Sequence, residues 1–306
     1  MGSLDNLVAV VTGAGRGIGR EHALLLAAEG AAVVVNDLGG ASDGSGSEAG
    51  LAEQVAKEIR AAGGKAVANS DDVSSAEGAQ RIVDAGISEF GKVDILINNA
   101  GILRDKVLVN LDEADFDIVV RVNLRGTFLL TKAAGNHWRD RSKAGEQVRA
   151  AVVNTTSESG VFGNPGQVNY AAAKAAIASL TQVASKELGR YGVRVNAIAP
   201  QARTRLTEGA FGDSLAAKDG QFDRWDPANV SPFVAYLSSP VCDLTGEVFI
   251  VGGSRVTRVK PWEKDKSWIL QTEGRWTVEG LAKAAADAGT PQGGATWTAN
   301  PGKAAK

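Results

Sequence analysis

The chain has 306 residues, of which 44% are hydrophobic and 22% charged, and its formal net charge is -2. This composition is typical of a globular protein with enough apolar material for a large core. It argues against nucleic-acid binding, because domains that bind nucleic acid usually have a strongly basic surface. The single cysteine, Cys242, excludes an intramolecular disulfide. His22 and His137 lie far apart without ligand-like neighbours, so we predict no metal site.

No segment approaches the ~18 uninterrupted apolar residues that a membrane-spanning helix needs. The N-terminus lacks a basic region followed by a long apolar stretch, and residues 7–11 run directly into glycines. We therefore expect a cytoplasmic protein without membrane association.

Short β-branched runs alternate with longer helical patterns along the chain. The expected strands are residues 8–11, 32–36, 65–68, 94–98, 150–154, 194–199 and 248–251. The expected helices are residues 22–29, 48–62, 76–90, 113–134 and 170–188. Continuous Val and Ile runs indicate strands that are buried on both faces of a parallel sheet. The sequence therefore predicts the α/β class: a single Rossmann-type, doubly wound parallel sheet of about seven strands, flanked by helices, with a C-terminal extension.

Three segments do not fit the alternating pattern. Residues 39–50 are rich in Gly, Ser and Ala and predict a flexible loop, and the charged residues 139–147 predict an exposed loop. We expect one domain over residues 1–254 and an extension over residues 255–306. The extension holds a helical pattern at 278–288 and an end that is a candidate for disorder. Three of its side chains are large aromatics, so we expect it to pack on its own subunit or on a neighbour: Trp262, Trp268 and Trp276.

A glycine-rich segment joins the first expected strand to the first helix. Gly13 permits a sharp turn, and Gly17 and Gly19 let backbone amides and a helix N-terminus approach a pyrophosphate. Arg16 and Ile18 belong to the same segment. A plain strand-to-helix turn is the alternative, but the position between strand and helix favours a dinucleotide site.

Asp37 ends the second expected strand, where an acid can accept hydrogen bonds from the adenosine ribose. A carboxylate there would repel the additional phosphate of NADP, so NAD is favoured. Arg16 argues in the opposite direction, because a cation in the glycine segment could attract that phosphate. A solvated Arg16 is the interpretation we prefer.

Tyr170 and Lys174 lie four residues apart, on one face of an expected helix. A tyrosine hydroxyl titrates near pH ~10 and is a poor base at neutral pH. A neighbouring ammonium would favour the phenolate and lower its pKa. Such a pair is common by chance and acquires meaning only from its surroundings.

The surroundings resemble the short-chain dehydrogenase/reductase family over residues 7–253. The motifs that carry the resemblance are Thr12-Gly13-x-x-x-Gly17-Ile18-Gly19, Asn98-Asn99-Ala100-Gly101, Val122-Asn123, and Ser157 thirteen residues before Tyr170. The resemblance implies that residues 1–254 form a dinucleotide-binding and catalytic domain. It also implies that Tyr170 exchanges the proton of the substrate oxygen and Lys174 lowers the tyrosine pKa and holds the nicotinamide ribose.

The same resemblance gives roles to further residues. Ser157 would hydrogen-bond the substrate oxygen, and Asn123 would fix a proton-relaying water through its helix backbone. Ser159 is a rival to Ser157, but its spacing to Tyr170 does not match the family, and a turn hydroxyl is a sufficient role for it. The residues implied in cofactor binding are Gly13, Arg16, Gly17, Ile18, Asp37, Asp72, Val73, Asn99, Ala100, Gly101, Tyr170, Lys174 and Pro200.

Several segments resemble one branch, the (3R)-hydroxyacyl-CoA dehydrogenase unit of peroxisomal multifunctional β-oxidation enzymes. They include residues 36–40, 99–105 and 163–169, and the Trp262 tail. Gln201 stands where the general family has Gly after Pro200. This branch implies oxidation of a 3-hydroxyacyl-CoA to the 3-ketoacyl-CoA, with a fatty or steroid acyl part.

Two features bear on that substrate. An arginine cluster of Arg104, Arg203 and Arg205 could hold CoA phosphates, but solvated or salt-bridged arginines are an equal interpretation. Residues 209–218 are expected to form a mobile lid.

The alternatives are a hydroxysteroid dehydrogenase, a 3-ketoacyl reductase and, remotely, a non-catalytic NAD-binding regulator. The long helices resemble the dimer interface of the family, so we expect a homodimer or a homotetramer.

Overall fold

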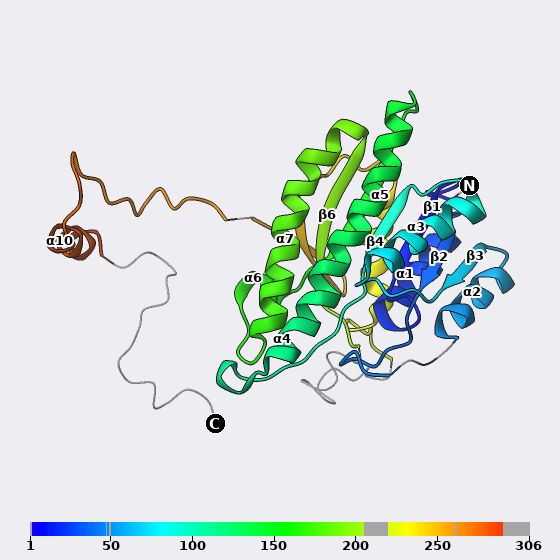
Figure 1. Ribbon diagram of the computed structural model, residues 1–306, viewed down its shortest axis with the longest axis horizontal. Coiled ribbons are helices and arrows are strands. Elements are labelled where there is room, and N and C mark those ends of the chain that lie inside the picture. Colours follow the sequence, from blue (N-terminus) through cyan, green and yellow to red (C-terminus); the bar gives the residue numbers. More distant parts are fainter. Residues whose placement is uncertain (1, 47, 49, 205–219, 261, 290–306) are drawn as a thin grey trace. The chain divides into compact units, whose positions relative to one another are not determined.

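The computed structural model describes residues 2–46, 48, 50–204, 220–260 and 262–289. It divides into two compact units, Met1–Val259 and Lys260–Lys306, called here the first and the second unit. Within the described residues of the first unit, an eight-stranded sheet has the order β3-β2-β1-β4-β5-β6-β7-β8 (Figure 1). The strands are β1 (Val8–Thr12), β2 (Ala32–Asn36), β3 (Lys65–Asn69), β4 (Ile95–Asn98), β5 (Ala150–Thr155), β6 (Val193–Pro200), β7 (Val248–Gly252) and β8 (Arg255–Val259).

The doubly wound parallel sheet is confirmed, and its last strand differs from the prediction. The strands from β3 to β7 pair in parallel, whereas β8 pairs antiparallel with β7. The sequence pattern predicts about seven strands and an extension that begins at residue 255. A two-residue turn at Gly253, whose φ is +55°, instead returns the chain along the sheet edge. The charged, largely exposed residues of β8 hid it from a search for apolar runs.

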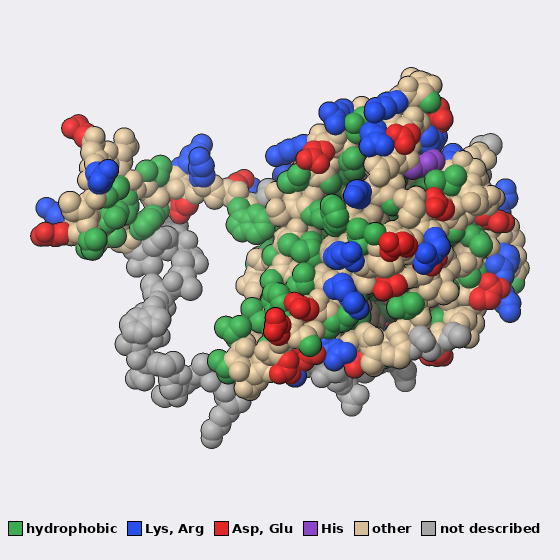
Figure 2. All heavy atoms as spheres, in the orientation of Figure 1, with side chains coloured by type: hydrophobic (Ala, Val, Ile, Leu, Met, Phe, Trp, Pro, Cys, Tyr) green, Lys and Arg blue, Asp and Glu red, His purple; other side chains and the backbone are tan. Residues whose placement is uncertain are grey.

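Helices cover both faces of the sheet. They are α1 (Gly17–Ala28), α2 (Leu51–Ala61), α3 (Ala76–Phe90), α4 (Glu113–Val120), α5 (Gly126–Lys143), α6 (Glu158–Phe162), α7 (Val168–Leu188), α9 (Ser231–Ser238) and, in the second unit, α10 (Val278–Ala288). Charged side chains are spread over the face of the first unit in Figure 2, with apolar ones between them over α4, α6 and α7. Among the described residues, no helix has the length and apolar character needed to cross a membrane.

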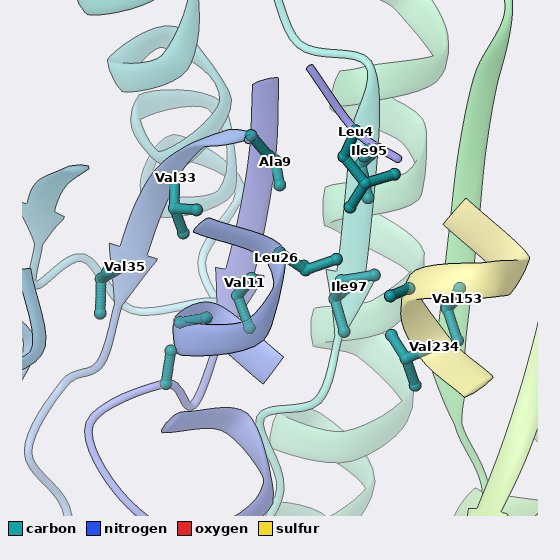
Figure 3. Packing of buried hydrophobic residues seen from close by; sticks show 14 of the residues in the cluster. Leu4, Ala9, Val11, Leu26, Val33, Val35, Ile95, Ile97, Val153 and Val234 are labelled. Atoms are coloured by element: carbon teal, nitrogen blue, oxygen red, sulfur yellow. The ribbon is translucent and has the colours of Figure 1, made fainter. Parts of the chain in front are cut away.

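Alternate residues of each buried strand supply two separate cores. Val11, Val33 and Ile97 pack with side chains of α1, α2 and α9 on one face (Figure 3). Val10 and Leu96 pack with side chains of α3 and α5 on the other. A strand that is buried on both faces needs apolar residues at every position, which explains the continuous Val and Ile runs.

The expected helix at 113–134 is two helices joined by a π-helical turn, Arg121–Arg125. The second of them, α5, continues to Lys143, so the loop expected at 139–147 is helical over its first half. Its charged residues lie on the exposed end of a helix, because charge alone does not distinguish a loop from a solvated helix face.

The second unit contains the helix expected at 278–288. Thr277 caps this helix by accepting a hydrogen bond from the Gly280 amide at 3.0 Å. The Trp268 indole donates to the Gly289 carbonyl at 2.8 Å. Trp262 is 73% exposed, so the described residues of this unit do not bury it.

Candidate active site

A cavity of about 1060 Å³ lies along the carboxyl ends of the parallel strands. This edge is where open α/β sheets bind ligands, and the volume is at the upper end of the ~300–1,000 Å³ of ordinary ligand pockets. The cavity lining includes every predicted catalytic and cofactor residue except Asn123. Those lining residues are Gly13, Arg16, Gly17, Ile18, Asp37, Asp72, Val73, Asn99, Ala100, Gly101, Ser157, Tyr170, Lys174 and Pro200.

The glycine segment is tied to the end of β4. The Asn99 side-chain amide donates to the carbonyl oxygens of Thr12 and Gly13, at 3.0 and 3.1 Å. Gly13 has a φ of +62°, and a Cβ there would lie 2.8 Å from the Ala100 Cα. Glycine is required at this position both by the backbone conformation and by the close approach of the two segments.

The geometry of the segment fits a dinucleotide. Helix α1 begins at Gly17, and no side chain caps its first turn, so the amides there are left for another acceptor. Uncapped amides at a helix N-terminus form an anion site, which suits a pyrophosphate. Gly17 has a φ of +54°, and the nearest atom to a Cβ built there is the Thr204 Cγ2 at 3.8 Å, so the approach to its backbone is open.

Asp37 lies beside the glycine segment at the end of β2. Its carboxylate accepts hydrogen bonds from the Gly15 amide at 2.8 Å and from the Gly39 amide at 2.7 Å. These bonds fix the acid at the edge of the cavity. Arg16 forms an ion pair with Glu48, a residue of the loop after β2 that the sequence analysis did not single out.

Tyr170 and Lys174 occupy successive turns of α7. The Lys174 Nζ is 5.4 Å from the centroid of the Tyr170 ring and donates to the Thr155 carbonyl at 2.8 Å. Lys174 is only 3% exposed. A long side chain that is so deeply buried is held in one position, beside the ring it was expected to assist.

The pKa values of this pair move in the directions that burial dictates. Burial raises the pKa of Tyr170 to about 12, against a lowering influence of its hydrogen bond with Ser157, and the charge of Asp105 raises it further. Burial lowers the pKa of Lys174 to about 7. The lowering of the Tyr170 pKa that is expected from a neighbouring ammonium is wrong for this structure, in which the pKa is raised. Low dielectric surroundings disfavour both charged forms.

Asn123 lies behind the cavity wall in the π-helical turn and is fully buried. Its side-chain amide donates to the carbonyls of Ile102 and Val119, each at 3.0 Å, while its Oδ1 has no hydrogen-bond partner. A Cβ at Gly101 would lie 2.5 Å from this Oδ1 and 3.6 Å from the Lys174 Nζ. A buried acceptor without a partner is suited to an ordered water.

A polar network that the sequence analysis missed borders the substrate side. The Ser159 hydroxyl donates to the side-chain Oε1 of Gln167 at 2.7 Å, and the Gln167 Nε2 donates to the Asp105 carboxylate at 2.6 Å. The Ser159 hydroxyl therefore bonds the side chain of Gln167 and not a backbone amide of its own turn. Asn169, fully buried before Tyr170, accepts from the Tyr170 amide at 2.8 Å. The sequence feature that could have pointed to Asn169 is its place directly before Tyr170.

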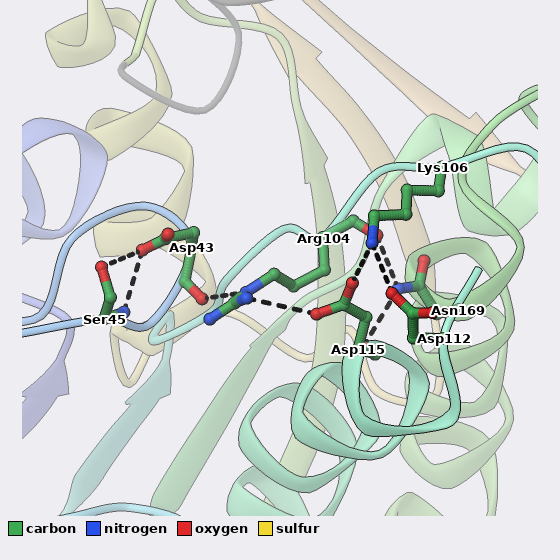
Figure 4. Close-up of polar contacts among 7 residues, drawn as sticks. All are labelled: Asp43, Ser45, Arg104, Lys106, Asp112, Asp115 and Asn169. Carbon is green, nitrogen blue, oxygen red and sulfur yellow. Dashed lines mark hydrogen bonds and ion pairs between the residues drawn. The ribbon is translucent and has the colours of Figure 1, made fainter. Parts of the chain in front are cut away.

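The arginines considered for CoA have partners in the chain. Arg104 pairs with Asp115 at 3.2 Å and donates to the Asp43 carbonyl at 2.6 Å (Figure 4). Arg203 pairs with Asp223 at 2.6 Å. The salt-bridged interpretation therefore holds for these two, while Arg205 and the expected lid at 209–218 lie outside the described residues.

The sheet, the glycine segment and the Ser157–Tyr170–Lys174 group define a nucleotide-dependent oxidoreductase that acts on a CH–OH group. A family model described as "short chain dehydrogenase" matches residues 7–209. The chain belongs to the short-chain dehydrogenase family, whose members use NAD or NADP.

Similar proteins are known from bacteria and animals. A protein named hydroxyacyl-CoA dehydrogenase ChsB1, of Mycobacterium tuberculosis, is 45% identical over 261 residues, which are 84% of this chain and 81% of the relative. The peroxisomal multifunctional enzyme type 2 of Drosophila melanogaster is 44% identical over 242 residues, 79% of this chain and 38% of that enzyme. The crystal structure of a short chain dehydrogenase from Mycobacterium avium has a TM-score of 0.83 and 44% identity, covering 94% of this chain and 95% of the other.

Proposed function

We propose that the chain is an NAD-dependent dehydrogenase that interconverts a 3-hydroxyacyl-CoA and its 3-ketoacyl-CoA, in β-oxidation of a fatty acid or a steroid side chain. The observation that carries this proposal is the Ser157–Tyr170–Lys174 group at the end of a cavity large enough for a dinucleotide and a substrate. The acyl-CoA part is supported by the name of the relative that is 45% identical over most of both chains.

The residues divide the proton chemistry between them. We assign to Ser157 and Tyr170 the task of holding the substrate oxygen, and Tyr170 takes its proton when the alcohol is oxidised. The nicotinamide supplies the hydride acceptor when it is bound. We infer that Lys174, which lies beside the Tyr170 ring, and a water held by the unpartnered Oδ1 of Asn123 would carry the proton away from Tyr170.

The preference for NAD is supported by charge. The Asp37 carboxylate is fixed by two glycine amides at the point where the ribose hydroxyls of adenosine would lie, and it would repel a phosphate there. Arg16, the residue that argues for NADP, forms an ion pair with Glu48, which weakens its attraction for a phosphate. This pairing supports the proposed preference for NAD.

A hydroxysteroid dehydrogenase or a 3-ketoacyl reductase is the second candidate, since the same proton chemistry serves a free ketone.

The outward faces of α4, α5 and α7 support assembly as a homodimer or a homotetramer, because each exposes an apolar side chain. These are Phe116, Phe128 and Val183, exposed by 39%, 48% and 51%. We propose further that the second unit packs on its own or a neighbouring subunit and covers Trp262 there.

The deciding experiment offers NAD with a series of 3-hydroxyacyl-CoA chains and 17-hydroxysteroids and follows the formation of NADH. Turnover of the acyl-CoA compounds with NAD is expected. Turnover of the steroids alone would select the second candidate. Nucleotide binding without turnover of any alcohol would instead identify a non-catalytic regulator.

A further inference from the structure

The loop after β2 contains a compact turn at residues 41–45. The Ala41 amide donates to the Ser45 carbonyl at 2.8 Å, and the Gly44 amide returns to the Ala41 carbonyl at 3.0 Å. The Asp43 carboxylate accepts from the amide and the hydroxyl of Ser45, at 2.9 and 2.6 Å. The turn therefore has a defined shape although its sequence is rich in Gly and Ser.

This turn is joined to the loop that follows β4. The Leu103 amide donates to the Ser42 carbonyl at 3.0 Å, and the Arg104 Nε donates to the Asp43 carbonyl at 2.6 Å (Figure 4). Gly44 lies against Ile102, since a Cβ there would be 2.9 Å from the Ile102 Cδ1.

The join crosses the cofactor side of the cavity. Strands β2 and β4 are the two neighbours of β1 in the sheet, so a link between the loops that follow them passes over the carboxyl end of β1. The glycine segment lies at that end. Ser42, Gly44 and Leu103 line the same cavity as Gly13 and Ile18. A dinucleotide lying on the glycine segment would be enclosed beneath this link.

Arg104 is the charged member of the link and is anchored on its far side. Its guanidinium reaches the Asp115 carboxylate on α4 at 3.2 Å, and Lys106 holds the other Asp115 oxygen at 2.8 Å. The Lys106 ammonium lowers the pKa of Asp115, so this carboxylate stays charged at neutral pH. The Arg104 carbonyl also accepts from the buried Asn169 amide at 2.9 Å. With both its main chain and its guanidinium held, Arg104 is fixed on the α4 side of the link and holds the 41–45 turn from there.

We propose that Arg104 is a positioning residue that latches the 41–45 turn over the bound dinucleotide and thereby sets the rate at which the dinucleotide leaves. This rests on the proposed function, because it requires that a nicotinamide dinucleotide occupies the cavity. The latch is a second task for a residue that the sequence suggested only as a phosphate ligand.

The experiment measures NADH dissociation from the full chain by stopped-flow fluorescence with an excess of a competing nucleotide, without any alcohol. Arg104→Gln removes the cation and is expected to raise the NADH dissociation rate about tenfold, the usual scale for a charge-assisted hydrogen bond. Arg104→Lys keeps the charge but lacks the planar guanidinium that reaches two acceptors at once. Its NADH dissociation rate should therefore lie between those of wild type and Arg104→Gln. Gly44→Ala leaves the arginine intact and strains the turn itself, because Gly44 has a φ of +80° that a residue with a Cβ rarely adopts, and it should raise the rate as well.

Arg60→Gln is the matched control. Arg60 also pairs with one carboxylate, Glu53, and donates to one backbone carbonyl, that of Ala66, but it lies on α2 and does not line the cavity. Its loss should cost similar stability and leave NADH dissociation unchanged.

Rates within twofold of wild type in Arg104→Gln and Gly44→Ala would overturn the latch, as would an equal acceleration in Arg60→Gln. A change confined to the pH profile of turnover would also overturn it, since Arg104 would then act through Asn169 on Tyr170. A wild-type protein that binds neither NADH nor NADPH would overturn the proposed function together with the latch.

Discussion

Tyr170 and Lys174 are neighbours on α7, yet burial moves their pKa values in opposite directions, to about 12 and about 7. At a pH between these values, both side chains are neutral in the protein without nucleotide. A neutral phenol can donate a hydrogen bond to a ketone, and its deprotonation requires a new positive charge nearby. The chemistry of the pair therefore depends on the occupant of the cavity.

Tyr170→Phe keeps the ring and removes the hydroxyl that we propose exchanges a proton with the substrate. We expect a loss of turnover of ~10²–10⁴, the usual contribution of a general acid–base. NADH affinity, measured by fluorescence titration, should be unchanged. Activity within tenfold of wild type would remove the acid–base role from this residue.

Cofactor choice is a second property of single residues. Glu48→Gln releases Arg16 from its ion pair, and we expect kcat/KM with NADP to rise about threefold to tenfold, with little change for NAD. Asp37→Asn removes the charge that repels the additional phosphate of NADP. Combined with Glu48→Gln, it should raise kcat/KM with NADP further. Steady-state kinetics with the two nucleotides measure both effects. An undiminished preference for NAD in the double variant would refute this account.

His22 makes the stability of the fold depend on pH. It is fully buried against Ser231, with 2.8 Å between its Nδ1 and the serine hydroxyl, and burial lowers its pKa from 6.5 to about 3. The unfolded chain takes up a proton below its pKa of 6.5, whereas the folded chain does not until about 3. The contribution of His22 to the free energy of unfolding is therefore fully present above the unfolded pKa of 6.5, and it is lost as the pH falls toward about 3.

We expect wild type to lose ~2 kcal/mol more than His22→Gln between about pH 7 and about pH 5, at 1.36 kcal/mol per pH unit once the unfolded imidazole is protonated. Urea unfolding at the two pH values measures this difference. Equal losses in the two proteins would show that the His22 pKa is not lowered.

At the scale of elements, the contact between α6 and α7 sets the distance between Ser157 and Lys174. A Cβ at Gly160 would lie 2.6 Å from the Ala175 amide nitrogen and 2.7 Å from the Lys174 Cβ. Such distances are shorter than real contacts allow, so a side chain at Gly160 must push the two helices apart.

Gly160→Ala is accordingly expected to lower kcat by at least about tenfold, because small displacements in an active site are costly, with NADH affinity largely kept. Gly189→Ala serves as its control, since a Cβ there meets nothing within 4 Å and Gly189 has an ordinary helical φ of -54°. Steady-state kinetics and fluorescence titration separate the two effects. A kcat for Gly160→Ala equal to that of the control would contradict the close contact.

Most of the elements could be predicted from the sequence because their signals are local. Runs such as Val33 to Val35 show burial on both faces, and the offsets from Asn123 to Lys174 follow the family pattern. The 41–45 turn, the Arg16–Glu48 pair and the pKa of Tyr170 could not be predicted, because they depend on contacts between distant segments and on burial. A charged edge strand such as β8 likewise has no apolar signal.

At the scale of the whole molecule, the boundary between the two units should fall after Val259 and not after residue 254. A chain ending at Val259 keeps β8 and is expected to bind NADH and to unfold in one transition. A chain ending at residue 254 leaves β7 as an open edge, which should promote aggregation. Light scattering and unfolding curves compare the two. Equal solubility of both truncated chains would show that β8 does not protect the sheet.

The π-helical turn at Arg121–Arg125 has a consequence for the length of this helix. A π turn holds one more residue than an α turn, and the helices on either side of it keep their faces. A one-residue deletion inside the turn should therefore leave the buried Leu129 and Leu130 in the core. It would move Asn123 relative to Lys174, because Asn123 lies inside the turn. Substitutions along α4 and α5 are thus expected to be better tolerated than the loss of this one residue.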